Sequence, residues 1–183
     1  MKKKLLLVLF TLFSFVAVYP QGSVNGAMDR VILEQADQMG KYFVAKDYVS
    51  FAKFTHPTVL SLMGGEERML QAIKDSFGQL EAEGVTFVGL TFTAPTKIAV
   101  VADELQCTLG QMIEMKVGGG SMTVSALLVA ISRDGGKNWY FADTSGNDLK
   151  TMQKMIPNLS NELVFTEIGE PTFIADPQPQ PKP

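Results

Sequence analysis

The hydrophobic pattern of this chain changes its period near Gly84. Before that glycine, apolar residues recur at helical spacing in three segments, and after it apolar and polar residues alternate. Such a change of period separates amphipathic helices from half-buried strands. Helices segregated from an antiparallel sheet define the α+β class, whereas a doubly wound fold needs strands and helices that alternate. The sequence therefore predicts an α+β domain in which N-terminal helices pack on an antiparallel sheet of four to six strands.

Three segments before Gly84 carry the expected helices. The first covers residues 27–45, with acidic residues early and lysines late, which complements the helix dipole. Asp47 is the expected cap of a short second helix. This helix should end at His56, because a residue that precedes proline avoids the α region. The third follows a glycine pair and ends near Gly84, which stands where a C′ glycine belongs.

The period-two part of the chain predicts strands at 86–92, 98–101, 105–117, 121–132 and 138–142. Gln111 interrupts the apolar row of the third strand beside Gly110, and we expect a β-bulge there. Gly118 to Gly120 supplies a hairpin turn between the two longest strands.

The first residues have the composition of an export signal. Lys2 to Lys4 form a positive start, and the apolar run 5–18 is shorter than a membrane-spanning helix requires. We expect a signal peptide over residues 1–22, cleaved between 17 and 27, and hence a periplasmic or secreted protein. A retained membrane anchor is the alternative. Loss of three lysines changes the formal charge from −3 to −6, which disfavours nucleic acid and anionic membranes as partners.

The rest of the chain divides into a main domain and a C-terminal appendage. The α+β domain is expected at 27–145. In the appendage, 146–176, Asn147 is the expected cap of a short helix, and apolar residues further along would strap against the domain. The tail 177–183 alternates proline with polar residues, which predicts an extended and disordered segment.

The sequence contains few residues for metal or nucleophilic chemistry. One cysteine, Cys107, excludes an internal disulfide and a multi-cysteine metal cluster, and one histidine, His56, argues against a histidine-rich zinc site. Cys107 shares a strand face with leucines, which predicts an inert buried thiol. No phosphate loop, metal-ligand spacing or dinucleotide fingerprint occurs. We therefore expect no metal and no cofactor.

A local motif predicts a structural turn before the last strand. Ser132, Asp134, Gly136 and Trp139 match the Ser-x-Asp-x-Gly-x-x-Trp pattern, the aspartate box of sialidase-like propellers. A propeller needs several copies at blade spacing, and this chain has one. In such a turn the aspartate binds backbone groups and the glycine supplies an unusual φ.

The order of elements resembles the nuclear-transport-factor-2-like superfamily (cystatin-like cone) over roughly residues 27–145. The residues that carry the likeness are Asp47-Tyr48, Phe54-Thr55-His56-Pro57, Gly64-Gly65 and Trp139-Tyr140-Phe141. The likeness is strongest to small exported bacterial members of unassigned function, which carry a similar Ser-x-Asp-Gly-Gly-x-x-Trp. The resemblance implies a cone-shaped domain whose helices and strongly curved sheet enclose a pocket for binding, catalysis or dimerisation. Fold alone does not assign the function.

We expect an apolar pocket that binds a small molecule or a partner protein without catalysis. The lining candidates are Tyr48, Phe51, His56, Phe77, Gln111, Met112, Trp139 and Phe141. An isomerase- or dehydratase-type enzyme is the first alternative, and it needs a carboxylate with a tuned pKa in the pocket. The carboxylate candidates are Asp103, Glu104, Glu114 and Asp143, with His56 or Tyr48 as partner, and no catalytic residue is assigned. Without a bulge at Gly110, Glu114 would point to solvent. The second alternative is a structural module that forms a homodimer through its open sheet face.

Overall fold

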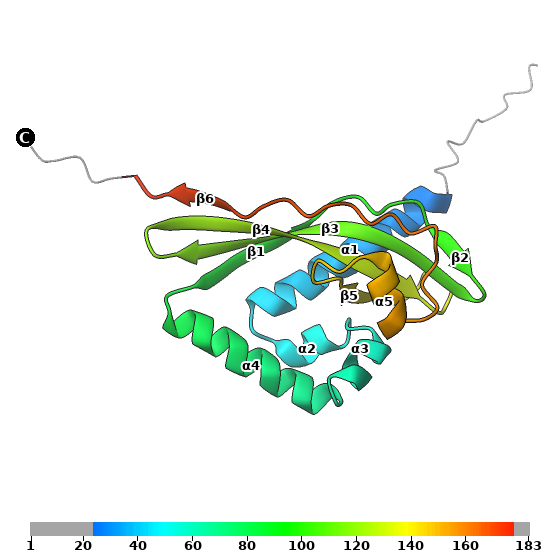
Figure 1. Ribbon diagram of the computed structural model, residues 1–183, viewed down its shortest axis with the longest axis horizontal. Coiled ribbons are helices and arrows are strands. Elements are labelled where there is room, and N and C mark those ends of the chain that lie inside the picture. The colour runs from blue at the N-terminus through cyan, green and yellow to red at the C-terminus, as the bar shows by residue number, and fades with distance from the viewer. Residues whose placement is uncertain (1–23, 178–183) are drawn as a thin grey trace, which may run out of the picture.

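The computed structural model describes residues 24–177, and in this part of the chain helices pack on a six-stranded antiparallel sheet (Figure 1). This confirms the α+β class and the expected size of the sheet. The expected signal peptide and nearly all of the proline-rich tail lie outside the described residues. Within 24–177, no helix has both the length and the apolar character that crossing a bilayer demands.

The N-terminal layer consists of α1 (Val24–Val44), α2 (Tyr48–Ala52), α3 (Pro57–Leu62) and α4 (Glu66–Ala82). Asp47 caps α2, since its side chain accepts a hydrogen bond from the Ser50 amide at 3.1 Å. The sequence did not predict α3. Helix α2 ends at Ala52, so the expected end at His56 is wrong. His56 and Pro57 instead begin α3, because proline suits the first helical position and the His56 imidazole accepts from the Thr58 amide.

The sheet contains β1 (Thr86–Phe92), β2 (Ala99–Val101), β3 (Glu104–Val117), β4 (Gly120–Ser132), β5 (Tyr140–Asp143) and β6 (Thr172–Ala175). The order along the sheet is β1-β3-β4-β5, while β2 pairs with β3 and β6 pairs with β4. The hairpin of β3 and β4 is the longest pairing, and its register is continuous from Leu105↔Ser132 to Val117↔Gly120.

The expected bulge at Gly110 is wrong. Gly110 pairs with Leu127 in regular register, and the irregularity lies in β1 between Phe87 and Gly89. The glycine serves a close approach instead: a Cβ at position 110 would lie 3.1 Å from the Thr93 methyl carbon. The Thr93 hydroxyl accepts a hydrogen bond from the Gly110 amide at 2.8 Å.

Both faces of the β3–β4 hairpin are buried at its β5 end. On the helix-facing side, α1 contributes to a core of Ile32, Ala36, Met39, Cys107, Leu109, Leu128, Ala130, Trp139 and Phe141. On the other side lies a second core of Val129, Ile131, Ala142, Met152, Ile156, Leu159 and Leu163. Consecutive strand residues point to opposite faces, so neighbours such as Leu128 and Val129 enter different cores.

The second core is built by the C-terminal segment. Helix α5 (Leu149–Met155) is capped by Asp148, whose side chain accepts from the Thr151 amide at 2.8 Å. The expected cap, Asn147, instead donates from its side chain to the Thr144 carbonyl. After α5 the chain follows the sheet as far as β6 (Figure 1). We call residues 164–171 of this path the strap.

Gly120 is required for the pairing of β6 with β4. A Cβ at this glycine would overlap the Ile174 carbonyl oxygen and approach the Phe173 ring to 2.7 Å. All four residues of β6 are exposed, so little apolar burial holds this strand in place. We therefore expect β6 to separate from β4 without unfolding of the remaining sheet.

Gly120→Ala should detach β6. The Asp176 amide donates to the Gly119 carbonyl at 2.8 Å, and we expect its hydrogen exchange to accelerate about tenfold, which corresponds to about 1.4 kcal/mol. Gly118→Ala is the matched control, because a Cβ there meets nothing within 4 Å. Equal exchange rates at Asp176 in the two variants would contradict the role given to Gly120.

Candidate functional site

A cavity of about 220 Å³ lies between the helices and the sheet. Side chains from α1, α2, α3, α4, β3, β4 and β5 surround it, and most of them are apolar. The lining residues are Met39, Phe51, Thr55, Val59, Met63, Met69, Ile73, Gln111, Leu128, Phe141, Ala142 and Asp143. We call this space the helix-side cavity.

The register of the sheet directs Gln111 toward the helices. Because β3 has no bulge, Gln111 shares the face of Leu109 and Ile113, and its partners across the sheet are Phe92 on β1 and Ala126 on β4. The glutamine therefore belongs to an otherwise apolar row that faces the helix layer.

The Gln111 side chain lacks a hydrogen-bond partner among the described residues, although only 7% of the residue is exposed. Within the described part of the chain, the one fully sealed side-chain polar atom without a partner is Thr144 Oγ1. The Gln111 amide is therefore open to the cavity that it lines. A primary amide offers two N–H donors and a carbonyl acceptor. A molecule bound in the cavity can therefore pair with both functions of this amide.

The mouth of the cavity carries a carboxylate and a methionine. Met63 is 41% exposed, and Asp143 is exposed at the end of β5. The Asp143 carboxylate accepts a hydrogen bond from the Ser145 amide at 2.6 Å. Methionine side chains adapt to irregular apolar shapes, and Met39, Met63 and Met69 all contribute to this lining.

The structure distributes the other expected lining residues over separate environments. Phe51, Gln111 and Phe141 line the helix-side cavity. Tyr48 and Phe77 stack on each other, with ring centroids 6.1 Å apart, within an aromatic cluster that includes Phe43 and Phe87. Met112 lies on the opposite sheet face and is 43% exposed. Trp139 is buried beside the preceding turn, and His56 lies in a polar cluster.

The turn before β5 is held by the residues of the aspartate-box pattern. Asp134 Oδ1 accepts from the Asn138 amide at 2.9 Å and from the Ser132 hydroxyl at 2.9 Å. Ser132 Oγ accepts from the Gly136 amide, and the Trp139 indole donates to the Gly136 carbonyl at 3.1 Å. Hydrogen bonds from the Asn138 backbone and side chain lower the pKa of Asp134 to about 2. These contacts are internal to the turn.

Glu104 is the centre of a buried polar cluster. Its carboxylate accepts from Arg133 Nε at 2.7 Å, and from the side chains of Gln106 and Asn158 at 2.9 Å each. Burial would raise the pKa of Glu104, but the hydrogen bonds from Asn158, Gln106 and Arg133 outweigh it and leave the pKa below its usual value. These contacts connect β3 to the C-terminal segment.

His56 belongs to the same cluster. Arg133 approaches its Nε2 at 3.4 Å, while Nδ1 accepts from the Thr58 amide at 3.3 Å. Burial of the ring and the neighbouring Arg133 guanidinium lower the pKa of His56 to about 4. The imidazole is therefore neutral at pH 7, and its Nδ1 is used as the helix cap of α3.

The remaining candidates for chemistry lie apart from the helix-side cavity. Asp103 and Glu114 are exposed on the surface, as expected for Glu114 in a strand without a bulge. Cys107 is fully buried, and burial raises the pKa of its thiol to about 12. Over residues 24–177, the side chains of His, Cys, Asp and Glu form no cluster of three or more that could hold a metal ion.

Several lining residues were not among the sequence candidates. Met69 and Ile73 are four residues apart in α4 and so share one face of the helix, and that spacing was the signal that could have identified them. Val59 had no such signal, because α3 itself was not predicted. Thr55 lines the cavity because the link between α2 and α3 pairs with β5. In this pairing the His56 amide donates to the Phe141 carbonyl at 3.0 Å.

The low pKa of His56 predicts a loss of stability in mild acid. The unfolded chain takes up a proton near pH 6.5 and the folded chain only near pH 4, so stability decreases as the pH falls between these values. The full loss is up to about 3 kcal/mol. His56→Asn keeps an acceptor for the Thr58 amide, and its free energy of unfolding should depend less on pH over this interval.

The imidazole titration can be followed directly by NMR, because the chain has one histidine. Protein without a histidine tag should titrate with a midpoint near pH 4. A midpoint near 6.5 would contradict the buried, neutral state assigned to this ring.

Comparisons with known proteins give no assignment of this site. No model of a protein family, no curated protein and no solved structure matches the chain.

Proposed function

We propose that this chain is an exported binding protein that holds a small, neutral and largely apolar molecule in the helix-side cavity. One observation carries the proposal: the amide of Gln111 is buried, opens to an apolar cavity, and has no hydrogen-bond partner among the described residues. Ligand pockets of proteins typically combine an apolar lining with a few polar groups that fix the orientation.

The volume of the cavity sets the size of the ligand. An engineered apolar cavity of about 150 Å³ is enough to bind benzene, whereas pockets for drug-sized molecules begin at about 300 Å³. At about 220 Å³, the helix-side cavity suits a molecule built on one ring or an equivalent aliphatic group. The methionines of the lining would adjust to its shape.

The polar groups favour a neutral ligand with an amide-like or carbonyl group. Gln111 can donate and accept at once, which matches the two functions of another amide. Asp143 is the one carboxylate among the described lining residues, and it repels anions at the mouth. The isomerase- or dehydratase-type alternative requires Tyr48 or His56 beside a carboxylate in the pocket. Neither of these residues lines the helix-side cavity.

Export and family membership belong to the same proposal. The lysines and apolar run at the start of the chain support export, and their residues lie outside the described part. The order of four helices followed by the antiparallel sheet, with a cavity between them, supports membership of the nuclear-transport-factor-2-like superfamily.

Gln111→Met tests the role of the amide. Methionine has nearly the same length but no hydrogen-bonding group, so we expect the unliganded variant to be up to about 1 kcal/mol more stable than wild type. Benzamide should bind wild type about tenfold more tightly than the variant, because a lost hydrogen bond in an apolar site costs about 1–2 kcal/mol. Ethylbenzene, which lacks the amide, should bind the two proteins equally.

Met112→Gln is the matched control. It places an amide at the neighbouring position on the exposed sheet face, and we expect no change in stability or in benzamide affinity. Native mass spectrometry of the purified protein adds an independent test, since a co-purified small molecule would show as a mass increase. A ligand-free protein that binds benzamide and ethylbenzene equally in wild type and Gln111→Met would refute the proposed function.

A further inference from the structure

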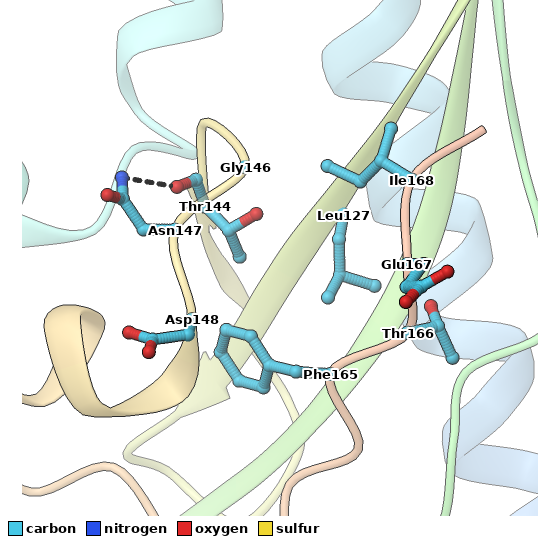
Figure 2. Close-up of a pocket in the computed structure, with 9 residues that line it drawn as sticks. All are labelled: Leu127, Thr144, Gly146, Asn147, Asp148, Phe165, Thr166, Glu167 and Ile168. Atoms are coloured by element: carbon cyan, nitrogen blue, oxygen red, sulfur yellow. Dashed lines mark hydrogen bonds between the residues drawn. The ribbon is translucent and has the colours of Figure 1, made fainter. Parts of the chain in front are cut away.

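A second hollow lies on the opposite face of the sheet, beneath the strap. It has a volume of about 430 Å³ and is bounded by β4, the turn from β5 to α5, and the strap (Figure 2). Its lining residues are Leu127, Thr144, Gly146, Asn147, Asp148, Phe165, Thr166, Glu167 and Ile168. We call this hollow the strap-side groove.

The Thr144 hydroxyl is a buried polar group without a partner. Thr144 is 1% exposed, and its Oγ1 is the one sealed side-chain polar atom without a hydrogen bond among residues 24–177. Figure 2 shows this hydroxyl pointing toward the space in front of Leu127 and Ile168, while the Thr144 carbonyl accepts from the Asn147 side chain at 2.7 Å. An unpaired buried hydroxyl costs about 1–3 kcal/mol, and a valine of the same shape would avoid that cost.

The strap forms the wall of the groove across from Thr144 and is not tied down along its middle. Thr108 Oγ1 donates to the Val164 carbonyl at 2.7 Å, and the pairing of β6 with β4 fixes the other end. Between these anchors, residues 165–171 form no hydrogen bond to any described residue, and Phe165 is held by apolar packing. A segment held at both ends by hydrogen bonds and in between by packing alone can lift locally at low cost.

The strap-side groove is separate from the helix-side cavity. On β4, Leu128 lines the cavity and Leu127 lines the groove. At the end of β5, Asp143 lines the cavity, and the next residue, Thr144, lines the groove. This division follows from the alternation of side chains along a strand. The two spaces therefore lie back to back across the same end of the sheet.

The groove has an apolar wall and an acidic rim. Leu127, Phe165 and Ile168 line the space that the hydroxyl faces, and Asp148 and Glu167 extend their carboxylates away from it (Figure 2). None of its described lining residues is a lysine or an arginine. An anion in the groove would be repelled by these two carboxylates, with no lysine or arginine in the described lining to offset them. An uncharged apolar molecule would not be repelled.

We propose that the strap-side groove is a second binding site, which takes a small uncharged apolar molecule bearing one hydroxyl group. The ligand hydroxyl pairs with Thr144 Oγ1, its apolar body packs against Phe165 and Ile168, and the strap lifts at its untied middle to admit it. This site differs from the proposed function in sheet face, in polar anchor and in ligand, so either can fail without the other.

The experiment titrates p-cresol and, separately, p-toluate into the full-length protein and follows methyl signals by NMR. We expect p-cresol to shift the methyl signals of Leu127 and Ile168, and p-toluate to leave them unchanged. Thr144→Val should weaken p-cresol binding at least fivefold and raise the midpoint of thermal unfolding, because the unpaired hydroxyl is gone. Thr91→Val, at an exposed position on β1, is the matched control and should change neither quantity.

Three results would overturn the proposal. The first is the absence of shifts at Leu127 and Ile168 with p-cresol. The second is p-cresol affinity that Thr144→Val leaves unchanged, and the third is equal binding of p-toluate. Shifts confined to Ile73 and Met69 would place p-cresol in the helix-side cavity and would also reject the strap-side groove. Gln111→Met distinguishes the two sites, since it should alter benzamide binding and leave the p-cresol shifts intact.

Discussion

The continuous pairing of β3 with β4 is the constraint on which the other features depend. Its register runs without a break from Leu105↔Ser132 to Val117↔Gly120. Because side chains alternate between two faces, this register decides which residues enter the core under α1 and which enter the core under α5. It also directs Gln111 to the helices and Leu127 to the strap. A shift by one residue would exchange the two linings.

The buried polar cluster around Glu104 connects these layers. Arg133 extends from the turn after β4, His56 from the start of α3, and Asn158 from the segment that follows α5. Gln106 adds to it, because its side chain binds the Asn158 carbonyl and the Ser160 amide. Removal of one member would leave other buried polar groups unpaired, so the cluster favours one placement of the C-terminal segment on the sheet.

Local patterns were sufficient for most of the fold. The change of period near Gly84 predicted the helices before it and the strands after it, and Asp47 was identified as a cap from its position alone. The pattern failed at Pro57, where a proline that was expected to end the second helix begins α3 instead, while α2 already ends at Ala52. It failed again at Gly110, because a glycine within a strand indicates either a bulge or a close contact. The close contact here is with Thr93, which lies outside the strand, so the local pattern could not identify it.

The sites were less predictable than the fold for the same reason. Gln111 was a sequence candidate because it interrupts an apolar row, and that signal is local. Val59 lines the cavity from α3, a helix that the sequence pattern did not predict. The run of apolar residues 126–131 did carry a signal of burial on both faces, which is what the cores under α1 and α5 impose. Partners such as Glu104 and Asn158 meet only after the C-terminal segment has docked.

The side-chain amide signals of Gln111 provide the most direct measurement of whether the helix-side cavity is a binding site. They can be assigned in a ¹H–¹⁵N spectrum by their absence from a variant without this glutamine. In the free protein we expect both amide protons to resonate as groups without a protein acceptor. At saturating benzamide at least one should move downfield, as a new hydrogen bond forms. Signals that do not move although benzamide is bound would contradict the role of Gln111 and the binding function built on it.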